Sequence, residues 1–94
     1  LLVDFSAKWC SPCEELEEKT FSNDTVRSLV SSHFIPLRID VSEMDDANEQ
    51  LMKKYGARQL PVILVRSPSG DTLARWDDFV AADVFAGELS KLSN

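Results

Sequence analysis

The 94-residue sequence predicts an α/β domain in which helices cover both faces of a mixed, four-stranded sheet. Helix-like and strand-like stretches alternate along most of the chain, and strand–helix–strand crossovers imply parallel pairing. A tight turn between the last two strands adds an antiparallel pair. No Pro-, Gly- or Ser-rich stretch is long enough to be a linker, so we expect a single domain over residues 1–94.

The first half of the chain is predicted to hold two strands and a long, broken helical region. Residues 1–7 alternate as a strand, and enough of both faces is apolar for a strand that is covered on both sides. A helix begins near Cys10 and loosens around residues 20–23. The next helical stretch is capped at residue 23 or 24, and the second strand follows over residues 34–41. Because the chain opens inside a strand-like run, we expect it to be a fragment of a longer protein.

The second half is predicted to hold a helix, a β-hairpin and a closing helix. The Asp45-Asp46 pair caps the first of these helices, and Gly56 ends it in a left-handed conformation. The hairpin pairs residues 61–65 with residues 72–76 across a turn rich in Ser, Pro and Gly. The closing helix is amphipathic. Its apolar face holds Phe85, Leu89 and Leu92.

The charge and hydropathy of the chain exclude two classes of partner. Sixteen acidic against ten basic side chains give a formal charge of −6, the wrong sign for binding a phosphate backbone. No apolar run approaches the roughly 20 residues that span a bilayer, and the first residues lack a basic leader followed by an apolar stretch. We therefore expect no nucleic-acid binding and no direct membrane insertion of this segment.

The strongest functional signal is the run Trp9-Cys10-Ser11-Pro12-Cys13. It stands where a strand leads into a helix, so the first sulfur is expected beside unpaired backbone N–H groups and the positive end of the helix dipole, which favour its thiolate. Pro12 fits the first helical turn, where its missing N–H costs nothing. We expect Cys10 to attack a substrate disulfide and Cys13 to resolve the mixed disulfide.

Two other interpretations of the cysteine pair are less favoured. A structural disulfide of this span closes almost no loop and adds little stability. A metal site needs about four ligands, whereas the chain offers two thiols and the distant His33 unless two chains share an ion. We therefore expect redox chemistry with no metal and no cofactor.

Four stretches of the sequence follow thioredoxin order and spacing. They are Val3-Asp4-Phe5, residues 9–13, Lys54-Tyr55-Gly56 and Leu60-Pro61. Over essentially its whole length the chain thus resembles the thioredoxin superfamily, which implies a three-layer sandwich. Thr20-Phe21-Ser22, Val26, Phe79 and Phe85 are more narrowly similar to the C-terminal domains of the DsbD family of bacterial thiol:disulfide interchange proteins. This resemblance implies electron transfer from a membrane-embedded redox domain of the same protein to a periplasmic partner.

The resemblance also implies roles for individual residues. Pro61 matches a cis-proline that faces the disulfide and leaves the backbone at Leu60 free to pair with an extended substrate; the alternative is a proline that starts a strand. Trp9 is expected to shield the sulfurs, which is compatible with an ordinary core position. With Pro12, these residues form the expected substrate-binding set. Asp4 matches a buried acid that helps to take the proton of the second cysteine, and burial would raise its pKa. The alternative for Asp4 is a solvent-facing polar position.

Four residues depart from the thioredoxin pattern. Pro36 stands where a lysine is common near the acid, Asp77-Asp78 stand where a glycine usually lets the substrate approach, and Val62 replaces a frequent threonine. These changes affect the expected choice of partner more than the expected chemistry.

The prediction is therefore a monomeric protein-disulfide reductase that acts on protein disulfides or dithiols at the periplasmic face of the bacterial inner membrane. The Ser11-Pro12 pair contains no His that would stabilise the reduced form strongly, which favours a reducing role. One alternative is a free thioredoxin-like reductase of the cytoplasm or periplasm. Another is a module that binds peptide in the groove beside Pro61 without turnover.

Overall fold

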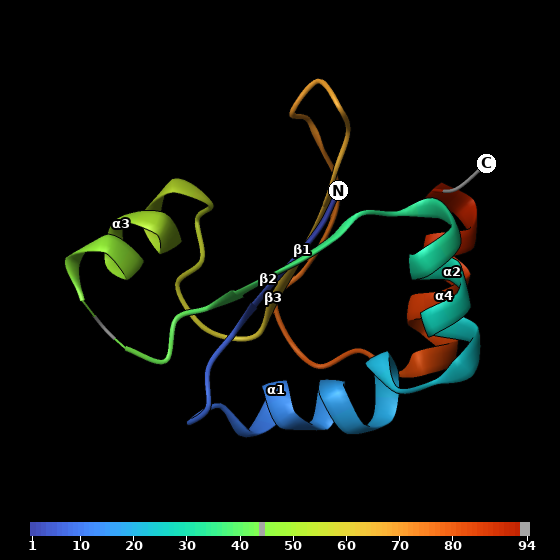
Figure 1. Ribbon diagram of the computed structural model, residues 1–94, viewed down its shortest axis with the longest axis horizontal. Coiled ribbons are helices and arrows are strands. Elements are labelled where there is room, and N and C mark those ends of the chain that lie inside the picture. The colour runs from blue at the N-terminus through green and yellow to red at the C-terminus, as the bar shows by residue number, and fades with distance from the viewer. Residues whose placement is uncertain (44, 93–94) are drawn as a thin grey trace.

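The chain folds into a four-stranded sheet between helices, and the computed structural model describes residues 1–43 and 45–92 (Figure 1). The strands are β1 (Leu2–Ser6), β2 (Pro36–Asp40), β3 (Val62–Arg66) and β4 (Thr72–Trp76). The helices are α1 (Ser11–Glu15), the π-helix η1 (Leu16–Phe21), α2 (Asp24–His33), α3 (Asp46–Lys54) and α4 (Ala82–Leu92). The predicted α/β architecture is confirmed.

The sheet has the strand order β2-β1-β3-β4 and is mixed, as predicted. β1 and β2 are parallel, whereas β3 is antiparallel to both of its neighbours. The expectation that strand–helix–strand crossovers give parallel pairs is therefore right for β1 and β2 and wrong for the crossover through α3. The reason lies in where β3 begins: Val62 pairs with Phe5, at the end of β1, so the chain enters the sheet from that edge and runs back along β1.

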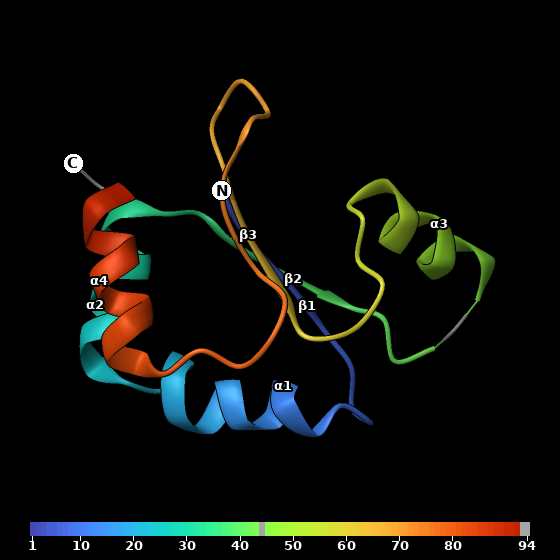
Figure 2. The ribbon, with the colours of Figure 1, turned by 180° about the vertical axis from the view of Figure 1, so that it is seen from behind.

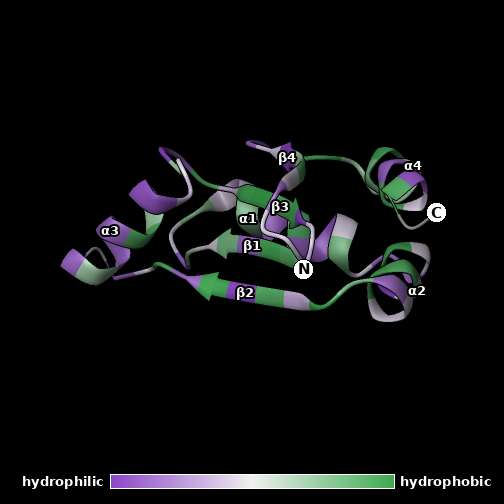
Figure 3. Ribbon diagram, turned by 90° about the horizontal axis from the view of Figure 1, so that it is seen from above, coloured by the Kyte–Doolittle hydropathy of each residue, from purple (hydrophilic) through white to green (hydrophobic). Residues whose placement is uncertain are grey.

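Two hydrophobic clusters lie on opposite faces of the sheet, and the alternation of β1 supplies both. Val3 and Phe5 belong to a cluster that extends to Met52 of α3, whereas Leu2 belongs to one that includes Phe85 of α4. Seen from above, α3 covers one face while α2 and α4 cover the other, with apolar colouring along the strands between them (Figure 3). The expected layering with helices on both faces is confirmed.

The predicted helix boundaries match the observed caps. The side chain of Asn23 accepts the backbone N–H groups of Thr25 and Val26 at the start of α2. Asp45 caps α3 in the same way, and Gly56 follows that helix with a φ of +67°, in the left-handed region that glycine tolerates best. These features were predictable because each depends on only a few neighbouring residues.

The long helical region differs from a simple loosened helix. After one turn of α1 the chain widens into the π-helix η1, which brings the fully buried Thr20 to segment 77–81. The Thr20 hydroxyl donates a hydrogen bond of 2.6 Å to the carbonyl of Val80. Viewed from behind, this connection between β4 and α4 passes close to the first helical region (Figure 2). Among the described residues, no helix combines the length and apolarity needed to cross a membrane.

Candidate active site

Cys10 and Cys13 form a disulfide at the N-terminus of α1, with their Cα atoms 5.3 Å apart. Cys10 is the N-cap of this helix, and its Sγ accepts the backbone N–H of Cys13 at 3.2 Å. Pro12 lies in the first turn, as predicted. After reduction, the same N–H and the helix dipole would stabilise a thiolate on Cys10.

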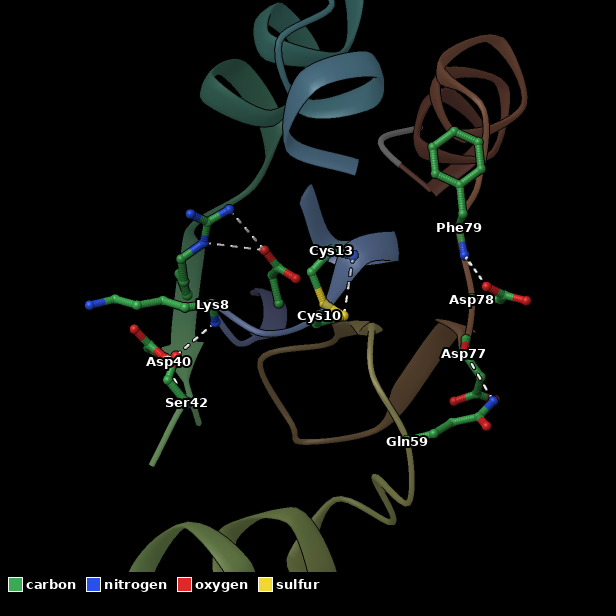
Figure 4. The surroundings of a disulfide bond; sticks show 11 residues. Lys8, Cys10, Cys13, Asp40, Ser42, Gln59, Asp77, Asp78 and Phe79 are labelled. Atoms are coloured by element: carbon green, nitrogen blue, oxygen red, sulfur yellow. Dashed lines mark hydrogen bonds and ion pairs between the residues drawn. A yellow bond between two sulfur atoms is a disulfide. The ribbon is translucent and has the colours of Figure 1, made fainter. Parts of the chain in front are cut away.

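Lys8, Asp40 and Ser42 lie on one side of the disulfide and form its first rim (Figure 4). Trp9 is 58% exposed, so the interpretation as an ordinary core residue is wrong. Its Nε1–H donates to the carbonyl of Ser42 at 2.8 Å, and the backbone N–H of Lys8 donates to the Ser42 hydroxyl at 2.8 Å. The Ser42 hydroxyl and N–H both bond Asp40, and they hold the pKa of that exposed carboxyl below its usual value.

Leu60 and Pro61 come from the loop that follows α3. The Leu60–Pro61 peptide bond is cis, and Pro61 is fully buried. Leu60 is half-buried against the hydrophobic cluster that contains both cysteines. The structure thus brings the predicted substrate-binding residue Leu60 and the disulfide into one cluster.

A second rim, opposite Lys8 and Asp40 in Figure 4, is formed by Gln59 and segment 77–79. The Gln59 amide donates to the carbonyl of Asp77 at 3.4 Å, and a side-chain oxygen of Asp78 accepts the N–H of Phe79 at 2.7 Å. Arg75 donates to the Asp77 carboxylate at 2.7 Å and also to the backbone carbonyls of residues 55 and 56. The acidic pair that departs from the thioredoxin pattern therefore borders the disulfide.

Asp4 lies on β1 with only 13% of its side chain exposed, which contradicts the solvent-facing alternative. Burial raises the pKa of its carboxyl above the usual value. The guanidinium of Arg38, 3.4 Å away, opposes that rise, whereas the nearby negative charge of Glu17 adds to it. Asp4 is thus a carboxyl whose ionisation depends on a single nearby cation.

Arg38 is the member of this charged cluster that sequence reasoning missed. The sequence drew attention to Pro36, where a lysine is absent, but the parallel register places Pro36 opposite Leu2 and Arg38 opposite Asp4. Arg38 also forms an ion pair with Glu17 of η1. The two-residue period of a strand was a usable signal, because it puts residues 36 and 38 on the same face.

Two cavities meet at this cluster of charges. One, of about 290 Å³, is lined by Asp4 and apolar residues of α2 and β2. The other, of about 340 Å³, is lined by Cys13 and by residues at the end of β1. Glu17 and Arg38 line both cavities, so this ion pair is common to the two. Within the described part of the chain, no group of three or more His, Cys, Asp or Glu side chains is placed to hold a metal ion.

Comparison with known proteins places this arrangement among thioredoxin-like proteins. A thioredoxin-like domain family matches residues 1–93. The thiol:disulfide interchange protein DsbD of Actinobacillus pleuropneumoniae is 31% identical over 98% of this chain, which spans only 16% of that relative.

Solved structures give the same placement. The C-terminal domain of Neisseria meningitidis DsbD in its oxidised form is 28% identical, with a TM-score of 0.86 over 100% of this chain and 79% of that domain. The reduced form of the same domain is 27% identical, with a TM-score of 0.85 over 97% of this chain and 78% of that domain.

Proposed function

The chain belongs to the thioredoxin-like domain family, and we propose that it donates electrons to protein disulfides through Cys10 and Cys13. It is a thiol:disulfide interchange domain similar to the C-terminal domain of DsbD, with a CxxC disulfide. The observation that carries the proposal is the position of the Cys10 sulfur, which caps α1 and accepts the N–H of Cys13. That position favours a thiolate nucleophile at neutral pH.

The proposed reaction has two exchange steps. The Cys10 thiolate attacks one sulfur of the substrate disulfide, the substrate S–S bond breaks, and its other sulfur leaves as a thiolate. Cys13 then loses its proton to Asp4 and attacks Cys10, so that the Cys10–Cys13 bond forms and the Cys10–substrate bond breaks. The second substrate sulfur leaves with the electron pair and takes a proton from solvent. The substrate gains two electrons, and the cysteine pair loses them.

Trp9, Pro12, Leu60 and Pro61 are proposed to bind the substrate segment. The exposed indole and the half-buried Leu60 offer apolar contact beside the sulfurs. A segment in extended conformation would lie between the two rims of Figure 4, with its disulfide over Cys10. The acidic Asp77 and Asp78 on the second rim favour a substrate that lacks negative charge near its disulfide.

The cellular setting is also a proposal. The chain spans about one sixth of the curated relatives it matches, so we propose that it works as one redox domain of a longer bacterial protein. In that setting it would receive electrons from a membrane-embedded domain and pass them on at the periplasmic face. Its working partners would be protein disulfides and dithiols, and the domain itself would be monomeric.

The direction of electron flow is tested by the equilibrium potential of the cysteine pair. The chain is equilibrated with a series of glutathione or dithiothreitol buffers, and its free thiols are counted by alkylation and mass spectrometry. A donor is expected to give a midpoint below about −220 mV. A midpoint well above about −180 mV would make the chain an oxidant or isomerase and would contradict the proposal.

A control distinguishes the reductase from a module that only binds peptide. The variant that carries Cys10→Ser and Cys13→Ser should lose all reduction of a peptide disulfide, whereas the native chain should reduce it. Retained peptide binding by the double variant, together with no reduction by the native chain, would favour the binding module. The free-reductase alternative shares the chemistry and differs in what surrounds the chain in its full-length gene.

A further inference from the structure

Three charged side chains from three different elements meet beside β1. Arg38 of β2 lies 3.4 Å from the carboxylate of Asp4 and is also paired with Glu17 of η1. The parallel register sets Asp4 and Arg38 directly opposite each other, so their contact is fixed by the backbone of the sheet. A single cation therefore serves two carboxylates.

The three groups differ in their access to water. The side chains of Arg38 and Glu17 are 50% and 54% exposed, whereas that of Asp4 is 13% exposed. An exposed ion pair such as Arg38 with Glu17 contributes little to stability. For Asp4 the situation is different, because a carboxylate with little hydration depends on a compensating charge. The effect of Arg38 should therefore be seen in the ionisation of Asp4 more than in the stability of the fold.

The cavities connect this pair of charges to the chemistry. Asp4 lines the first cavity and Cys13 lines the second, while Arg38 and Glu17 line both. The cavity beside Cys13 is thus also lined by the Arg38 guanidinium, which contacts Asp4. Glu17 holds that guanidinium from the side of η1.

We propose that Arg38 is a positioning residue of the disulfide-exchange site: lying where the two cavities meet, it holds Asp4 oriented and ionised to accept the Cys13 proton. This inference rests on the proposed function, because it assigns Arg38 to the second exchange step. Arg38 itself does not touch the sulfurs or the substrate and acts only through Asp4.

The sign of the pH dependence follows from the groups that face Asp4. Burial raises the pKa of Asp4, Arg38 of β2 lowers it and Glu17 of η1 raises it. On the other side, β3 places the uncharged Ile63 opposite Asp4. Arg27 of α2 lines the same cavity as Asp4 but is not among the charges that shift its pKa. Loss of Arg38 should therefore raise the pKa of Asp4, and loss of Glu17 should lower it.

The test follows the Asp4 carboxyl by carbon-13 NMR as a function of pH, in the oxidised chain. Arg38→Gln is expected to move the Asp4 titration to higher pH and Glu17→Gln to lower pH. Arg27→Gln removes the same charge from the same cavity and is the matched control, expected to leave the titration unchanged. Arg38→Lys keeps the charge without the planar fork and is expected to fall between the native chain and Arg38→Gln.

The rate of the resolving step is then measured against pH in the same variants. Its acidic limb should move with the Asp4 titration, and in an Asp4→Asn background Arg38→Gln should have no further effect. Equal shifts of the Asp4 titration in Arg38→Gln and Arg27→Gln would overturn the proposal. A shifted Asp4 titration without a matching shift in the acidic limb of the pH–rate profile would overturn it as well. The titration needs no turnover. If the variants show the expected shifts of the Asp4 titration but the chain exchanges no disulfides, the result would count against the proposed function instead.

Discussion

Cys10 and Cys13 share a disulfide but have different surroundings. The Cys10 sulfur caps α1 and accepts a backbone N–H, whereas Cys13 lies one turn inside the helix and lines the cavity of about 340 Å³. The first environment stabilises a negative sulfur, whereas the second places the Cys13 sulfur beside a cavity. The two cysteines should therefore differ sharply in reactivity once they are reduced.

This asymmetry predicts opposite outcomes for two isosteric substitutions. Cys13→Ser leaves the attacking thiolate but removes the resolving thiol, so most of the protein should accumulate as a mixed disulfide with a peptide disulfide. Cys10→Ser removes the stabilised thiolate and should form little adduct in the same time. Intact-protein mass spectrometry at fixed reaction times measures both. Equal amounts of adduct from the two variants would show that the assigned roles are wrong.

At the scale of residues, the sequence predicted the cysteine pair and Pro12 because their environment depends on one helix start. The burial of Asp4 was also foreseen, from the resemblance to the buried acid of thioredoxins. Arg38 was not, because its contact with Asp4 depends on which residues of two strands stand opposite each other. Strand register is set by distant packing and cannot be derived from a stretch of a few residues.

Among the elements, η1 connects the start of the active-site helix to the connection between β4 and α4. Its Thr20 is fully buried, and the Thr20 hydroxyl supplies the hydrogen bond to the carbonyl of Val80. Val80 follows Asp77, Asp78 and Phe79, which border the disulfide. One side-chain hydrogen bond thus helps to fix the position of the second rim relative to the helix that carries the cysteines.

Loss of that hydrogen bond should destabilise the fold. Thr20→Val keeps the shape of the side chain but leaves the Val80 carbonyl without its donor, which should lower the free energy of unfolding by about 1 to 3 kcal/mol. Thr20→Ser keeps the hydroxyl and should lose less, mainly the packing of one methyl group. Thermal unfolding followed by circular dichroism compares the two, and an equal loss in both variants would assign the effect to packing alone.

Prediction of the elements succeeded where the signals are local. Asn23, Asp45 and Gly56 mark helix ends through hydrogen bonds and dihedral angles within a few residues. The π-helix η1 was predicted only as a loosening near its end, because its wider turn is accompanied by a contact 60 residues away in sequence. The direction of β3 likewise depends on the edge at which the chain re-enters the sheet.

The molecule as a whole depends on two hydrophobic clusters separated by one sheet. Phe85 of α4 is fully buried in the second cluster, where its ring meets those of Phe21 and Trp76 at centroid distances of 5.7 and 4.9 Å. It therefore joins η1, β4 and α4 at a single point. A small domain has a total stability of only about 5–15 kcal/mol, so the packing around Phe85 accounts for a large share of the free energy of unfolding.

Truncation of this ring should be severe. Phe85→Ala is expected to lower the free energy of unfolding by about 3–5 kcal/mol through lost burial and the cavity it leaves. The neighbouring Val84 is 55% exposed, so Val84→Ala on the same helix should change the free energy by less than about 0.5 kcal/mol. Urea unfolding of both variants measures the difference. Similar small losses in the two variants would mean that the second cluster repacks freely.

The two tryptophans lie in contrasting places, which has an optical consequence. Trp9 is exposed on the rim of the disulfide, while Trp76 is half-buried against Phe85 in the second cluster. Emission from Trp9 should therefore be red-shifted, accessible to iodide and sensitive to whether the neighbouring sulfurs are joined. Emission from Trp76 should be bluer and should change only when the cluster opens. The native chain thus carries two separate built-in fluorophores, one that reports its redox state and one that reports its folding.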